Sequence, residues 1–230
     1  GARELVDPRH CAVGEIKARL AKDDVKAIGY GVMRFTKDHD ANRRAFEFAK
    51  AMGLGYLSAD PDPNSFDSRD KLCAEFGVAI GIHNHGPGHR YDTIYKIAAQ
   101  IKDHHPLIGC CVDTGHFLRS RQDPVRAVEV FGKRTFGVHL KDVKDAKTFT
   151  ILGEGDLRTV DLLKALAAIQ YDYCLALEYE EKPEDPIADI RIAECELKTT
   201  QKRRWTRVNI DNRLVRLGTA RYALDLELTE

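Results

Sequence analysis

Short apolar runs alternate along the chain with segments in which apolar residues recur every three or four positions. The runs are typical of buried strands and lie at 25–32, 54–59, 78–82, 107–112, 135–140 and 173–177. The helical periodicity predicts helices at 40–52, 68–76, 91–102, 123–131 and 159–169. We therefore expect six strand-then-helix units between about residue 25 and residue 195.

The strands are continuously apolar, which favours burial on both faces of a parallel sheet. The unit length is that of a (β/α)8 TIM-type barrel, in which eight units take about 250 residues. The alternative is a doubly wound open sheet, which usually carries a glycine-rich phosphate loop after its first strand. Neither GxGxxG nor GxxxxGK[ST] occurs in the chain.

Six strands are two fewer than a complete barrel needs. If residue 25 begins the third strand, residues 1–21 are the tail of the preceding helix, and we expect an N-terminally truncated barrel. The expected barrel domain covers residues 1–195, and residues 196–230 form a basic C-terminal tail that contains no recognised pattern. An open barrel would expose two strand edges, so homo-oligomer formation stays open.

Composition excludes several protein classes. Lys plus Arg and Asp plus Glu both number 36, and this balance argues against nucleic acid or a membrane surface as the partner. No run reaches the roughly 18 apolar residues of a membrane span. The six cysteines form no CxxC pair, which indicates reduced thiols and a cytoplasmic protein. A signal before Gly1 is left open, because the chain does not begin with Met.

Potential metal ligands follow four successive predicted strands. The strand ends are followed by His83-Asn84-His85, Asp113-Thr114-Gly115-His116, His139-Leu140-Lys141-Asp142 and Glu178-Tyr179-Glu180. The carboxyl ends of barrel strands converge on one mouth, where active sites lie. Two imidazoles and two carboxylates there predict a site for one divalent ion, namely Mn, Co, Fe, Mg or Zn.

The same residues carry a family resemblance. In their order and spacing, the runs IHNHG, CVDTGH, VHLKD, LGEGD and LEYE resemble the sugar phosphate isomerase/epimerase family of xylose isomerase-like barrels, within the AP endonuclease family 2 superfamily. The resemblance implies a metal-dependent enzyme acting on a small sugar, sugar phosphate or keto-sugar. By this resemblance, the ligands are His83, Asp113, His139 and Glu178, and His116 contacts the substrate.

One departure from the family pattern concerns the proton-transferring groups. Ketose 3-epimerases of this superfamily have a glutamate where this chain has His83, so Glu178 is the one carboxylate base that remains. Removing a proton next to a carbonyl requires a base within reach and a Lewis acid on the oxygen. We expect Glu178 to be the base and His85 (or His83, if it does not ligate) the opposing acid. We expect Lys141 to stabilise the enediolate oxygen.

Other readings of the site remain open. A lyase acting on a keto-sugar or keto-polyol would use the same first step, and a non-catalytic relative would bind a sugar without turnover. An endonuclease IV-type repair enzyme is disfavoured, because Lys147 stands where a histidine is required. A small carbohydrate is the expected ligand. Arg34, His89 and Arg119 are candidate substrate contacts, because they follow strand ends.

Overall fold

The computed structural model describes residues 13–22, 24–182 and 184–193 of the chain. Its central element is a parallel sheet of six strands in the order β1-β2-β3-β4-β5-β8. The strands are β1 (Gly29–Met33), β2 (Tyr56–Ala59), β3 (Ala79–His83), β4 (Ile108–Asp113), β5 (Thr135–Leu140) and β8 (Cys174–Leu177). The six predicted strands are thereby confirmed.

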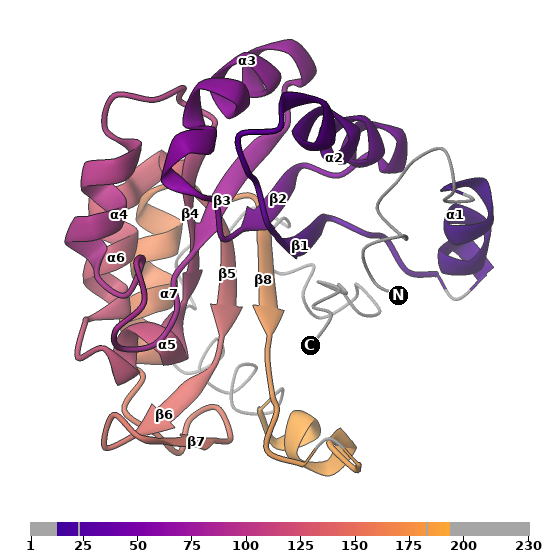
Figure 1. Cartoon of the computed structure of the whole chain (residues 1–230). Helices are drawn as coiled ribbons and strands as arrows, with labels where there is room; N and C mark the ends of the chain where they lie inside the picture. Colours follow the sequence, from indigo (N-terminus) through magenta and orange to yellow (C-terminus); the bar gives the residue numbers. More distant parts are fainter. Residues whose placement is uncertain (1–12, 23, 183, 194–230) are drawn as a thin grey trace.

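Helices connect the strands (Figure 1). The longer ones are α1 (Val13–Lys22), α2 (His39–Met52), α3 (Phe66–Phe76), α4 (Ile94–Ile101), α6 (Pro124–Phe131) and α7 (Thr159–Ala168). Residues 187–193 are also helical. None of the described helices is long and apolar enough to cross a membrane. The predicted basic tail, residues 196–230, lies outside the described residues.

The strand order decides between the two architectures that the sequence left open. Each strand pairs in parallel with the next strand of the sheet along the chain. A doubly wound sheet reverses its strand order at a switch point, and this sheet has no such reversal. Figure 1 shows α4, α6 and α7 together on one side of the sheet. The fold is therefore of the TIM-barrel type, with a parallel sheet of six strands.

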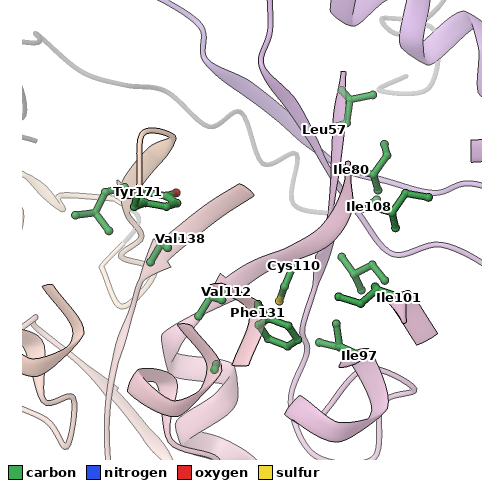
Figure 2. Packing of buried hydrophobic residues seen from close by; sticks show 14 of the residues in the cluster. Leu57, Ile80, Ile97, Ile101, Ile108, Cys110, Val112, Phe131, Val138 and Tyr171 are labelled. Atoms are coloured by element: carbon green, nitrogen blue, oxygen red, sulfur yellow. The ribbon is translucent and has the colours of Figure 1, made fainter. Parts of the chain in front are cut away.

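The two faces of the sheet belong to separate clusters of buried side chains. Large aliphatic residues such as Ile80, Ile108 and Val138 belong to the core shared with the helices, and Figure 2 shows Ile97 and Ile101 of α4 beside this face. The other face carries a smaller cluster that includes Ala79 and Cys111. Because strand side chains alternate between faces, successive residues of one apolar run, such as Ala79 and Ile80, belong to different clusters.

Three short elements that were not predicted from the sequence lie beyond the carboxyl ends of β4 and β5. They are α5 (Thr114–Arg119), which follows β4 directly, and the antiparallel pair β6 (Asp142–Lys144) and β7 (Thr148–Thr150). Buried Asp142 organises the hairpin, because its carboxylate accepts backbone N–H bonds from Val143, Gly153, Gly155 and Leu157 at 2.9–3.1 Å. In Figure 1 this hairpin lies beyond the carboxyl end of β5.

Candidate metal centre

Four potential ligands meet at the carboxyl edge of the sheet. They are His83 at the end of β3, Asp113 at the end of β4, His139 in β5 and Glu178 directly after β8. One ligand atom from each lies within 4.8 Å of the others. His83 Nε2 lies 3.2 Å from His139 Nδ1, and His139 Nδ1 lies 2.9 Å from Glu178 Oε2. The structure thus brings together the four residues that the sequence predicted as ligands.

The residues between the ligands hold the strand ends in place. Asn84 donates to the carbonyl of Asp113 and accepts the Asp113 N–H, both at 2.8 Å, and so joins the end of β3 to that of β4. The Thr114 hydroxyl accepts the Lys141 N–H at 2.9 Å and donates to the Lys141 carbonyl at 2.6 Å, which joins β4 to β5. Sequence reasoning missed both residues, although they lie inside the HNH and DTG runs.

Gly115 has a packing role in the same run. A Cβ at this position would lie 2.6 Å from Lys141 Cγ. The stem of the lysine side chain therefore passes directly over the glycine. Any larger residue at 115 would displace the buried Lys141 ammonium, which faces the ligand carboxylates.

Lys141 balances the charge of the cluster. Its side chain is buried, and its Nζ forms an ion pair with Glu178, lies 3.7 Å from Asp113 Oδ2 and lies 3.2 Å from Glu180 Oε2. Burial opposes the charged lysine, but the carboxylates of Asp113 and Glu178 outweigh it and raise the pKa of Lys141. The ammonium is therefore protonated at neutral pH and acts as a fixed positive charge.

The pKa values of the two ligand carboxylates are shifted in opposite directions. Burial, with the Glu178 charge nearby, raises the pKa of Asp113 to about 7. Burial also disfavours the charged form of Glu178, but its bonds with His139 and Lys141 outweigh this and lower its pKa. Burial and the neighbouring His139 lower the pKa of His83, so its imidazole stays neutral. A neutral imidazole beside an ionised carboxylate is the ligating form of both groups.

A divalent metal fits this donor set. Asp113 Oδ1 accepts the His116 N–H at 2.7 Å, but Asp113 Oδ2 is buried without a hydrogen-bond partner. A buried carboxylate oxygen left without a donor costs free energy unless a cation satisfies it. Two imidazoles and two carboxylates suit Zn, Fe, Co or Mn. His83, Asp113, His139 and Glu178 would hold the ion.

Two further histidines lie beside the cluster. The rings of His85 and His116 lie 4.8 Å and 5.9 Å from the His83 ring, centroid to centroid. Burial lowers the pKa of both to about 4, with the neighbouring His89 acting on His85 and Lys141 acting on His116. Both imidazoles are therefore uncharged at neutral pH. Their predicted roles, catalysis for His85 and substrate contact for His116, stay predictions.

The three remaining candidates occupy different places. Arg119 lies near the cluster, with Nη1 3.4 Å from His116 Nδ1 and its guanidinium 5.2 Å from the Phe149 ring of β7. His89 lies next to His85, at 4.4 Å between ring centroids. Arg34 is exposed and lies 3.7 Å from Asp62, and the structure shows no contact between it and the four ligands. Its role as a substrate contact stays a prediction.

Comparison with known proteins identifies relatives of this chain by sequence. The chain is 27% identical over 139 residues to an inosose dehydratase of Clostridium botulinum, an alignment that covers 52% of this chain and 46% of that protein. The chain thus spans about half the length of the curated relatives it matches.

Solved structures show the same fold at low identity. D-allulose 3-epimerase from Methylomonas sp., in complex with D-allulose, superposes with a TM-score of 0.63 at 18% sequence identity. The superposition covers 86% of this chain and 84% of the epimerase chain. IOLI protein with a bound zinc atom superposes with a TM-score of 0.65 at 16% sequence identity. This superposition covers 84% of this chain and 83% of the IOLI chain. The family model described as xylose isomerase-like TIM barrel matches residues 13–195. This chain therefore belongs to the xylose isomerase-like TIM barrel family.

Proposed function

We propose that this chain belongs to a metal-dependent enzyme that removes a proton next to a carbonyl group of a small sugar or keto-polyol. One observation carries the proposal: the ligand atoms of four residues lie within 4.8 Å of one another, beside the Lys141 ammonium. The four residues are His83, Asp113, His139 and Glu178. Isomerisation through an enediolate and epimerisation next to a carbonyl both begin with this proton abstraction. The carbohydrate ligand is supported by the D-allulose bound to the epimerase of the same fold.

A bound divalent ion would supply Lewis-acid polarisation of the substrate oxygen. The chain's own residues then have distinct tasks. Lys141, held protonated by its carboxylate neighbours, places a positive charge where an enediolate oxygen develops. Glu178, held ionised by its bonds with His139 and Lys141, is the proposed proton acceptor.

The neighbouring groups shape the substrate site. Phe149 of β7 stands 5.1 Å from Lys141 Nζ and its ring lies 6.2 Å from that of His116, so the hairpin packs beside the ligand cluster. Lys141, Phe149, Glu178 and Tyr179 lie close together there. His116 and Arg119 belong to α5 and lie next to the Phe149 ring, and they are the proposed substrate contacts.

A lyase is the second candidate, and a specific observation favours it. The residue at the end of β3 is His83, whereas ketose 3-epimerases of the superfamily have a glutamate there. An epimerase must return a proton to the opposite face of the same carbon, but a dehydratase needs one base and a protonated leaving hydroxyl. The relatives found by sequence are inosose dehydratases, which agrees with this alternative.

Proton exchange in deuterated water tests the proposal. The zinc- and manganese-loaded chain is incubated with ketohexoses and with an inosose, and NMR follows the hydrogen next to the carbonyl. Exchange with a new stereoisomer supports an epimerase, and loss of water supports a lyase. Binding without exchange of any hydrogen would contradict catalysis and favour a passive sugar-binding relative.

A further inference from the structure

A second cluster of potential ligands lies beside the first. Asp60 follows the end of β2, and His85 and His89 lie in the segment after β3. One ligand atom from each of the three lies within 4.8 Å of the others. The Asp60 Oδ2 to His89 Nε2 distance is 3.5 Å, and the rings of His85 and His89 are 4.4 Å apart, centroid to centroid.

The backbone after β3 forms a turn that brings the His89 side chain next to that of His85. The His89 N–H donates to the Gly86 carbonyl at 3.3 Å, which closes a tight turn. Gly88 has a φ of +90°, a conformation that side chains with a Cβ rarely adopt. The Gly88 N–H donates to Asp92 Oδ2 at 2.9 Å, which fixes the turn from its other end.

Asp60 faces this cluster with Oδ2, the oxygen that lies 3.5 Å from His89 Nε2. Its Oδ1 atom is buried and has no hydrogen-bond donor. The Oδ1 atom lies 3.7 Å from Arg90 Nε, and Arg90 Nη1 binds Asp62 at 3.0 Å. A cation bound at Oδ2 would compensate the charge of this carboxylate, whose other oxygen has no hydrogen-bond donor.

We propose that Asp60, His85 and His89 form a second divalent-cation site, next to the one already described. Two imidazoles and one carboxylate are a ligand set of Zn and non-haem Fe sites, in which the open positions accept water or substrate oxygen. The site does not rest on the proposed function. The rings of His83 and His85 lie 4.8 Å apart, so the two sites are immediate neighbours.

The present geometry indicates that the second site is the weaker one. His89 Nδ1 accepts the Tyr91 N–H at 3.2 Å, which places the ring proton on Nε2, facing Asp60. Ligation through Nε2 requires the proton to leave that atom and the Tyr91 bond to break. The second site therefore fills after the first. When filled, it removes His85 from proton transfer and leaves His116 as the free imidazole.

Zinc titration of the metal-free chain against a chromophoric chelator tests this site. We expect two binding steps, with the second more than tenfold weaker than the first. Asp60→Asn and His89→Gln should each weaken the second step more than tenfold and leave the first intact. Asp113→Asn should remove the first step and retain the second, which separates this inference from the proposed function.

The matched control is His39→Gln, because His39 is exposed and binds Ser68 away from both clusters. This variant should retain both steps. The His89 side chain is partly exposed, so His89→Gln remains informative even if Asp60→Asn fails to fold. A single binding step in the unaltered chain would overturn the proposal, as would a second step that persists in both variants.

Discussion

Asp113 and His139 are direct partners in the parallel register of β4 and β5. In the same way, His83 pairs with Cys111, which lies two residues before Asp113 on the same face of its strand. Side chains alternate along a strand, so this register turns the ligands to one side of the sheet. A shift of one residue in either pairing would turn a ligand toward the helices. Strand register therefore builds the candidate centre.

Replacing Lys141 should separate folding stability from metal binding. Lys141→Met removes the buried ammonium and leaves Asp113 and Glu178 uncompensated, so the metal-free chain should lose about 3 kcal/mol of unfolding free energy. Zinc should bind more tightly, because a competing positive charge is gone. Urea unfolding with and without zinc measures both effects. The exposed Lys144→Met is the control, and equal losses in the two variants would contradict this assignment.

Metal binding should release protons in a pH-dependent way. Asp113, with a pKa raised to about 7, holds a proton below that pH, and the metal must displace it. From this group we expect clearly more proton release per metal at pH 6 than at pH 8. Affinity should therefore fall as the pH drops below 7. Calorimetry in buffers of different ionisation enthalpy gives the proton count, and equal release at both pH values would refute the assignment.

The hairpin should depend on Asp142. Asp142→Asn replaces a carboxylate that accepts four backbone N–H groups by an amide with one acceptor oxygen, so we expect a loss of about 2–3 kcal/mol. Proteolysis should then cut first within residues 142–157. Asp145→Asn, at an exposed turn residue of the same hairpin, should change stability by less than about 0.5 kcal/mol. Unchanged protease resistance in Asp142→Asn would count against this role.

Close packing at Gly109 gives a test of the fold itself. A Cβ at Gly109 would lie 1.9 Å from the Arg134 carbonyl oxygen, so Gly109→Ala must displace backbone and should cost about 3 kcal/mol or more. Gly14 in α1 has nothing within 4 Å of a Cβ, and Gly14→Ala should be neutral or stabilising by up to about 1 kcal/mol. Thermal unfolding of the two variants compares them. Similar midpoints would be incompatible with this packing.

The sequence predicted the strands and the first ligand cluster because both depend on local patterns. Buried strands are visible as apolar runs, and His83 or Asp113 is visible as a polar residue at a strand end. The hairpin is different, because its strands have three residues each and its acceptor, Asp142, binds donors 11 to 15 residues away. The pattern of apolar residues along the sequence does not predict contacts over this separation.

The second cluster was only partly visible for the same reason. His85 and His89 attract notice as histidines after a strand, but Asp60 lies in a turn-rich segment among other aspartates. Its meeting with His89 depends on the turn at Gly86 to His89 and on the pairing of β2 with β3. Sequence position alone gives no signal for it. The short helix α5 was missed because six residues are too few for a helical period to show.

Metal content of the purified chain tests the central claim most directly. After dialysis that removes weakly held ions, elemental analysis should find about one Zn, Fe, Co or Mn per chain. Glu178→Gln should lower that content several-fold. Glu180→Gln should not, because Glu180 also contacts Lys141 but is largely exposed and lies outside the ligand cluster. No metal in the unaltered chain, or equal loss in both variants, would contradict a metal centre built from the four strand ends.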